Sequence, residues 1–393
     1  MRRWLTVAMV IAMAASAGIA AAAGEQHGQH GSAMAVKSRP ALAVGAAHDP
    51  RGVLWVTGLD DSGHLFIQPW DAGQKAWGKA QVLDVGSDVI SADGENRPKI
   101  AFGPDHVAVI SYTQPLSRPY TGEIRLVRSD DDGRSFSAPR TVHEDRQIIT
   151  HRFDSILFDA NGKLHVVWID KRDQVQGGKY RGAAIYRTES ADGGLTFGAD
   201  TKVADHSCEC CRIALAVAPE GTPVALWRHV FEPNIRDHAF ASLTAGTRIV
   251  RATQDNWKLD ACPHHGPGLA RSASGGYHAV WFGERNGVMG ARYGRLKPDG
   301  QAAGKPVNLP DNQAEHADVA SLGSKVAIVW RSFDGQQTRL RAWVSVDDGA
   351  HFDQRELSSS KQQNDHPRMV TGPQGISVVW RTRDEISVFP ITF

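Results

Sequence analysis

The four cysteines of this 393-residue chain lie in two short stretches, and they are its most distinctive chemistry. Residues 206–212 read HSCECCR and contain three of them, and residues 262–265 read CPHH and contain the fourth. Thiolates this closely spaced suit soft metal ions, copper(I) first and zinc second, and neighbouring histidines can complete the shell. The expected metal ligands are Cys208, Cys210, Cys211, Cys262, His264 and His265.

Two other interpretations of these cysteines stay open. An even cysteine count in an exported protein is typical of disulfides, and a bond from Cys262 to the 208–211 group would link two parts of the fold. A redox-active dithiol would need a thiol of lowered pKa, which Arg212 could provide. The c-type haem motif Cys-x-x-Cys-His does not occur, so we expect neither haem nor a nucleotide cofactor.

Residues 1–23 predict a secretory signal peptide, because a basic start precedes an apolar run and then small residues. The run is short for a stable membrane span. We therefore expect a periplasmic or secreted protein with no membrane span after cleavage. Residues 24–37 follow as a flexible arm, in which His27, His30 and Met34 form a secondary metal-binding segment.

The charge balance excludes one large class of partners. Lys and Arg number 44 against 43 Asp and Glu, so there is no basic field that would attract nucleic acid. The 11 tryptophans and 39 glycines, with little helical periodicity, indicate short strands and many turns. We expect a monomer.

A repeated phrase organises residues 38–393 into one domain. A polar residue, often followed by Pro, opens an apolar strand; a Gly turn follows, and a second strand usually ends in Trp. The copies recur at about fifty-five residues, which is room for four short strands each. They open at Arg39, Arg97, His151, Cys211, His265, His316 and His366. The period predicts an all-β propeller of seven four-stranded blades, or six if one terminal copy is not a blade, with residues 33–37 supplying a closing strand.

Three repeats share the pattern Ser-x-Asp-x-Gly-x-x-Phe after the Trp strand, at residues 129–136, 190–197 and 345–352. Ser and Asp can bond to turn amides, Gly can take a positive φ, and Phe can hold the hairpin against its blade. The pattern resembles the Asp box, or BNR repeat, of the sialidase superfamily, which links the third and fourth strands of a blade. The resemblance spans nearly the whole mature chain and implies a sialidase-like propeller. It implies little about activity, since the box lies away from the active face and also occurs in non-enzymatic propellers.

In a propeller the first strands line the central axis, so the residues that open the repeats meet at one face. Copies four and five are neighbours, and this arrangement brings all four cysteines to that face on adjacent blades. Arginine predominates there and should attract a small anion or carboxylate. The expected ligand-binding residues of this channel mouth are Arg39, Arg97, His151, Arg212, His316 and His366.

The sialidase resemblance also implies an arginine triad, a Tyr nucleophile assisted by Glu, and an Asp acid. Arg39-Pro40 stands where the Arg-Ile-Pro motif of the family would begin, but the Ile is missing. None of the six tyrosines lies in the last two repeats, so no nucleophile stands out. If the protein is an enzyme, its catalytic candidates are Arg39, Arg97, Asp170 and Glu284.

Together these patterns predict an exported propeller with a Cys/His soft-metal site at the channel mouth, used for metal binding, delivery or sensing rather than for catalysis. One alternative is an exo-sialidase-like glycoside hydrolase that acts on an acidic sugar. Another is a propeller stapled by disulfides that binds a periplasmic protein. The expected partners are accordingly a metal ion, a small anionic ligand or such a protein.

Overall fold

The computed structural model describes residues 41–175, 181–244, 246 and 248–393. Within these ranges the only helix is the short α1 (Arg172–Val175), and antiparallel strands make up the rest of the regular structure. None of the helical residues in the described ranges forms a segment long and apolar enough to cross a membrane. The predicted signal peptide, the arm, its three candidate ligands, the closing strand and Arg39 all lie outside these residues.

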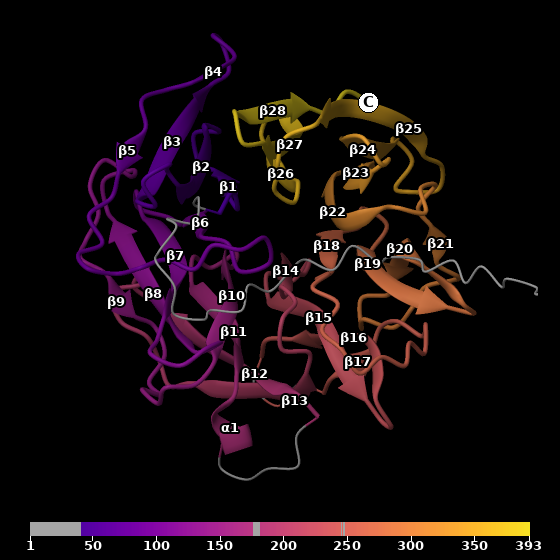
Figure 1. Cartoon of the computed structure of the whole chain (residues 1–393), viewed down its shortest axis with the longest axis horizontal. Helices are drawn as coiled ribbons and strands as arrows, with labels where there is room; N and C mark the ends of the chain where they lie inside the picture. Colours follow the sequence, from indigo (N-terminus) through magenta and orange to yellow (C-terminus); the bar gives the residue numbers. More distant parts are fainter. Residues whose placement is uncertain (1–40, 176–180, 245, 247) are drawn as a thin grey trace, which may run out of the picture. The chain divides into compact units, whose positions relative to one another are not determined.

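The first two sheets follow the order of the chain (Figure 1). One contains β1 (Gly45–His48), β2 (Leu54–Leu59), β3 (Leu65–Asp71), β4 (Ala76–Trp77) and β5 (Gln81–Val82). The next contains β6 (Lys99–Phe102), β7 (Ala108–Pro115), β8 (Gly122–Ser129) and β9 (Arg140–Thr141). Each is an antiparallel meander, because consecutive strands are joined by short turns.

An eight-stranded sheet comes third and contains two meanders. The first consists of β10 (His151–Phe158), β11 (Leu164–Asp170), β12 (Ala183–Ser190) and β13 (Thr201–Ser207). The second consists of β14 (Ala214–Val217), β15 (Pro223–Phe231), β16 (Ile235–Ser242) and β17 (Val250–Arg251). A single residue pair, Ser207 with His229, joins β13 to β15.

Three further sheets complete the described residues. They contain, in turn, β18 (Gly268–Arg271), β19 (Tyr277–Arg285), β20 (Val288–Leu296) and β21 (Val307–Asn308); β22 (Glu315–Leu322), β23 (Lys325–Phe333), β24 (Thr338–Ser345) and β25 (Asp353–Ser360); and β26 (Arg368–Gly372), β27 (Gly375–Arg381) and β28 (Ile386–Pro390). The last sheet has three strands where its two predecessors have four.

The first strands of the meanders contact one another in a closed cycle, which Figure 1 shows around the centre of the described domain. The cycle runs β1, β6, β10, β14, β18, β22, β26 and back to β1. The loops that precede these strands therefore converge, which is the arrangement needed to gather residues that are far apart in the sequence.

The core lies between neighbouring sheets, and the repeated tryptophans are its largest members. Trp168, Trp227, Trp330 and Trp380 are each at most 1% exposed. Trp330 of β23, for example, packs in one cluster with Val280 of the preceding sheet. The central residues of second strands such as β11 and β23 are buried on both faces, which explains the apolar run that leads to each Trp.

The three Ser-x-Asp-x-Gly segments form similar turns after the third strand of their sheets. In the first, Ser129 Oγ accepts a hydrogen bond from the Gly133 amide at 2.9 Å, and Asp131 Oδ1 accepts one from the Ser135 amide at 2.9 Å. The same pairs of bonds recur around Ser190 and Ser345. These turns lie at the outer strands of the sheets, away from the first strands.

A break in strand register shapes the start of β22. The pairing of β22 with β23 shifts between Glu315 and Asp318, and His316 has a φ of 50°. A bulge of this kind ends the strict alternation of side chains between the two faces. Consecutive residues can then approach the same site, as Glu315 and His316 do.

We expect replacement of Trp330 by Ala to lower the free energy of unfolding by about 3–5 kcal/mol, because it leaves a large cavity between two sheets. Urea denaturation measures the change. The control is Val346→Ala, whose side chain is exposed and should change stability by less than about 0.5 kcal/mol. Equal effects of the two substitutions would contradict the assignment of Trp330 to the core.

Candidate metal centre

Three cysteine sulfurs form a triangle in the loop between β13 and β14. Cys208 Sγ lies 3.8 Å from both Cys210 Sγ and Cys211 Sγ, and the latter two are 3.9 Å apart. All three side chains are buried. These separations far exceed the sulfur–sulfur bond of about 2.05 Å in a disulfide.

Cys262 completes the group from the loop between β17 and β18. Its sulfur and those of Cys208 and Cys210 all lie within 4.8 Å of one another. Cys262 is exposed, unlike the other three, and all four cysteines are free thiols. The cluster therefore has three buried members and one at the surface.

The spacing of the sulfurs has the dimensions of a metal–thiolate centre. A tetrahedral site with metal–sulfur bonds of about 2.3 Å has sulfur–sulfur edges of about 3.8 Å, and a trigonal site with the same bonds has edges of about 4.0 Å. The observed 3.8–3.9 Å triangle fits both geometries. A soft ion could thus bind with little movement of the loop.

One thiol of the cluster is strongly acidified. Hydrogen bonds from the other three thiols, that of Cys210 first, hold the pKa of Cys208 well below its ordinary value. The same bonds raise the pKa of Cys210 and Cys211, and they raise that of Cys262 to about 11. Without metal the cluster is best described as one thiolate that accepts from three thiols.

Two buried arginines support this negative charge. Arg236 Nη1 donates to Cys208 Sγ at 3.3 Å, and its Nε donates to the carbonyl of Leu259 in the loop that carries Cys262. Arg228 is 1% exposed and donates to the carbonyls of Arg236 and His265. A guanidinium beside the sulfurs offsets the charge of a metal–thiolate complex.

The two histidines of the CPHH stretch have different surroundings. His264 is half-buried and has a φ of 53°. The ring of His265 stacks between Phe282 and His316, with ring centroids 4.2 Å from each. His265 therefore packs in a second group of side chains rather than against the sulfurs.

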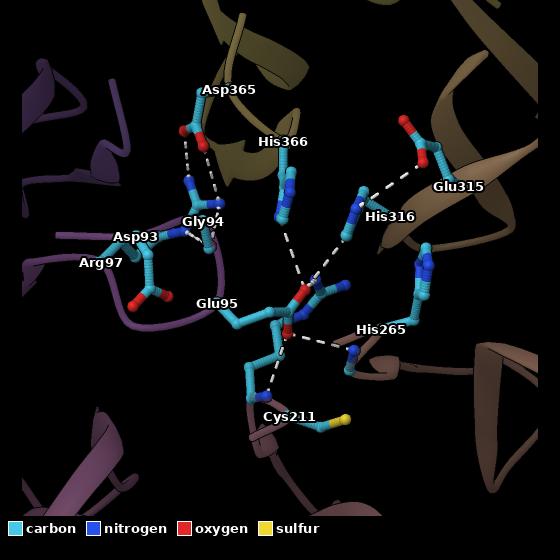
Figure 2. A network of polar contacts seen from close by, with 12 residues as sticks. Asp93, Gly94, Glu95, Arg97, Cys211, His265, Glu315, His316, Asp365 and His366 are labelled. Atoms are coloured by element: carbon cyan, nitrogen blue, oxygen red, sulfur yellow. Dashed lines mark hydrogen bonds and ion pairs between the residues drawn. The ribbon is translucent and has the colours of Figure 1, made fainter. Parts of the chain in front are cut away.

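This second group, the channel-mouth cluster, consists of Glu95, His265, Glu315, His316 and His366 (Figure 2). Its members come from the loops before β6, β18 and β26 and from the start of β22. The rings of His316 and His366 stack with centroids 3.3 Å apart. Burial lowers the pKa of His265, His316 and His366 well below 6.5.

Glu95 is the hub of the channel-mouth cluster. Its Oε2 accepts from the amides of Arg212 and Gly266 at 3.0 and 3.1 Å. Its Oε1 lies 3.2 Å from Arg212 Nη1, 3.3 Å from His316 Nδ1 and 3.5 Å from His366 Nδ1. Burial alone would raise the pKa of Glu95, but the charge of Arg212 and the two imidazoles hold it well below its ordinary value.

Arg97, which was expected to attract an anion, and two other cations near it are paired inside the protein. Arg97 binds Asp365 at 2.7 Å, and Lys99 binds Asp154 at 3.0 Å. Arg368 binds Asp318 at 3.1 Å on the same inner surface. A cavity of about 260 Å³ lies among these side chains and the first strands. Its positive charges are largely balanced, so the cavity is less cationic than the arginine count suggested.

Two further predicted site residues lie in a separate buried group. His151 stacks on His143 with ring centroids 3.9 Å apart. Asp170 is fully buried, accepts from Trp168 Nε1 at 2.7 Å and forms an ion pair with Arg172 at 2.8 Å. The structure thus places Asp170 in a packed network away from the cavity lining, while Glu284 is half-buried on β19.

Several residues of these sites were missed by sequence reasoning. Glu95 and Glu315 belong to the channel-mouth cluster, and Arg236 contacts a cysteine sulfur, yet none was singled out. Glu95 stands two residues before the repeat opening at Arg97, and Glu315 stands directly before the opening at His316. The sequence signal that could have identified both residues is an acidic side chain next to a residue that opens a repeat.

No protein-family model and no curated protein matches the chain. Among solved structures, an ulvan lyase of polysaccharide lyase family 25 aligns with a TM-score of 0.59 at 12% identity, over 90% of this chain and 93% of its own. An α-L-arabinofuranosidase from Fusarium graminearum aligns with a TM-score of 0.53 at 14% identity, over 77% of this chain and 92% of its own. An α-L-arabinanase from Penicillium chrysogenum aligns with a TM-score of 0.51 at 12% identity, over 79% of this chain and 98% of its own.

These neighbours are β-propeller glycoside hydrolases and polysaccharide lyases. The chain shares their all-β propeller fold, as its sequence predicts. At such low identities the likeness extends to the fold alone. Membership of the sialidase superfamily itself stays a prediction.

Acid should destabilise the metal-free protein. Below about pH 6.5 the unfolded chain protonates its histidines, whereas burial keeps His265, His316 and His366 neutral in the fold. The unfolded state then binds more protons, so stability falls as the pH falls. We expect Tm to decrease as the pH falls from about 7.5 to about 5. In His366→Gln, Tm should depend less steeply on pH. A Tm independent of pH in both proteins would contradict this expectation.

Metal binding to the thiols should release protons, because Cys210, Cys211 and Cys262 have raised pKa values and must lose their protons to become ligands. Calorimetric titration with zinc at about pH 7, in two buffers of different ionisation enthalpy, measures the number released. We expect the wild type to release about one proton from each of these three cysteines. The Cys262→Ser variant should release one proton fewer in total. Binding without proton release would show that the sulfurs are not the ligands.

Proposed function

We propose that this protein is an exported, monomeric seven-bladed propeller that binds a soft metal ion through Cys208, Cys210, Cys211 and Cys262. The observation that carries the proposal is the triangle of free sulfurs with edges of 3.8–3.9 Å. Sulfurs at this spacing have the dimensions of a metal–thiolate centre and are not bonded to each other. The closed cycle of first strands supports the count of seven blades.

Copper(I) is the first candidate ion and zinc the second. Thiolates are soft ligands and select copper(I) or zinc over magnesium or calcium. The predicted export signal and the arm with His27, His30 and Met34 favour a copper-handling role in the periplasm. Arg228 and Arg236 favour a centre of net negative charge, which four thiolates around either ion would have.

The uneven exposure of the sulfurs supports delivery or sensing. Cys208, Cys210 and Cys211 are buried, so they would retain the ion. Cys262 is exposed and could exchange places with a thiol of a partner protein or small carrier. Such exchange at one ligand lets an ion leave without unfolding of the site.

The test is metal stoichiometry and thiol counting on protein purified anaerobically. We expect one copper(I) per chain at this site and an affinity reduced about 100-fold or more, roughly 2.7 kcal/mol, in Cys211→Ser. Glu209→Gln is the matched control, because Glu209 lies in the same loop and pairs with Lys171 without contributing a sulfur. Oxidation of all four thiols in the purified protein, with no stoichiometric metal, would leave the disulfide-stapled interaction propeller as the better proposal.

A second candidate function is action on an acidic saccharide. The observation in its favour is that the structural neighbours named above are a polysaccharide lyase, an arabinofuranosidase and an arabinanase, all of which act on saccharides. The cavity of about 260 Å³ among the first strands is lined by Arg97, Lys99 and Arg368, among others. A sugar carboxylate would bind there. Assays with a fluorogenic sialoside and with ulvan test it: turnover that is lost in Arg368→Ala would support catalysis, and no turnover would remove this candidate.

A further inference from the structure

We infer that the protein has a second metal centre, formed at the channel mouth by His265, Glu315 and His316. One ligand atom of each residue lies within 4.8 Å of the others. Glu315 Oε2 and His316 Nε2 are 3.9 Å apart, a gap that one ion at about 2.1 Å from each atom can bridge. This centre takes a borderline divalent ion such as zinc, and it does not depend on the thiolate site.

The hydrogen bonds of His316 match those of a metal-bound imidazole. Its Nδ1 lies 3.3 Å from Glu95 Oε1, so the proton sits on Nδ1 and the lone pair on Nε2 faces Glu315. A carboxylate on the far nitrogen is the usual support of a metal-ligating histidine. Glu95 is a positioning residue here rather than a ligand, because Arg212, Gly266 and the imidazoles already occupy both of its oxygens.

His265 is difficult to explain by packing alone. Its Nδ1 is buried and has no hydrogen-bond partner among the described residues. A phenyl ring would make the same stacks on Phe282 and His316 without burying an unsatisfied polar atom. Coordination of an ion would give this imidazole a function that fits its position.

Backbone geometry brings the two adjacent ligands together. Glu315 and His316 would point to opposite faces of a regular strand. The register shift at the start of β22 and the φ of 50° at His316 remove this alternation. Figure 2 shows Glu315, His316 and His265 on the same side of the cluster, with His316 between Glu315 and Glu95.

Charge and ligand type set the class of ion. Two imidazoles and a carboxylate suit zinc, nickel or copper(II), whereas the sulfur triangle suits softer ions. Two of the nearby cations are paired with carboxylates, Arg212 with Glu95 and Arg331 Nε with Glu315 Oε1 at 2.9 Å. Three protein ligands leave a coordination position open for water or an anion, as in catalytic rather than structural zinc sites.

Cobalt(II) titration of the metal-free full-length protein under anaerobic conditions separates the two centres. Cobalt bound to thiolates gives an intense sulfur-to-metal charge-transfer band, while cobalt bound to imidazole and carboxylate gives only weak visible bands. We expect two tightly bound equivalents of cobalt in the wild type, one at each of these two centres. In His265→Phe and in Glu315→Gln we expect one equivalent, with the charge-transfer band intact. In Cys208→Ser we expect one equivalent of cobalt as well, but with the charge-transfer band lost and the weak visible bands kept.

His351→Phe is the matched control, because His351 is an exposed histidine in an outer turn and should leave both equivalents in place. The Tm of metal-free His265→Phe should be unchanged or higher, whereas a purely structural imidazole would give a lower Tm. If His265→Phe does not fold, Glu315→Gln decides, since Glu315 is only half-buried. The second centre would be overturned if Glu315→Gln still bound two equivalents of cobalt. It would also be overturned if the wild type bound only one equivalent and showed only sulfur-to-metal bands. A single equivalent without sulfur bands would instead refute the proposed thiolate site.

Discussion

The buried ion pair between Glu95 and Arg212 is the interaction on which both side-chain clusters depend. Arg212 directly follows Cys211, and its guanidinium also donates to the carbonyls of Pro267 and Ala317. Glu95 in turn holds the Gly266 amide and two imidazoles. One carboxylate thus fixes the loops before β6, β14, β18 and β26 and the start of β22. The cysteine triangle and the histidine stack owe their relative positions to this pair.

Burying such an ion pair costs free energy, so stability alone does not explain its presence. Removing two charges from water costs several kcal/mol, and a buried ion pair is often no more stabilising than well-packed apolar residues. Loss of one partner is far more damaging, because the other charge is left without compensation. The Arg97–Asp365 and Arg368–Asp318 pairs repeat the arrangement around the same axis. Specific positioning of the converging loops, rather than stability, is the gain that these pairs offer.

The two clusters differ in ligand chemistry although they are neighbours. Arg228 connects them, since it donates to the carbonyl of His265 and lies close enough to Cys208 to favour the thiolate form. Sulfur ligands with arginine support favour a soft ion held in a negatively charged site. Imidazole and carboxylate ligands favour a borderline ion with an open position. The loop before β14 contributes three sulfurs, whereas the channel-mouth cluster takes only one or two side chains from each of its converging elements.

The fold was largely readable from the sequence, and the reason is periodicity. Apolar runs that end in Trp168, Trp227, Trp330 or Trp380 must be buried on both faces, and only packing against neighbouring sheets achieves this. The same register placed the 208–211 loop beside Cys262, because equivalent positions of successive repeats meet at one face. Repetition converts distance along the chain into adjacency in space.

What the sequence could not determine is how individual charges pair across the axis. Arg97 looked like an anion ligand, but Asp365 lies 268 positions away and no local pattern links the two. His265 looked like a partner of the cysteines until its ring was seen between Phe282 and His316. Repeat spacing determines which loops converge, and this much the sequence settled alone. Which side chains then meet depends on rotamers, bulges and long-range ion pairs, and only the tertiary structure decides these.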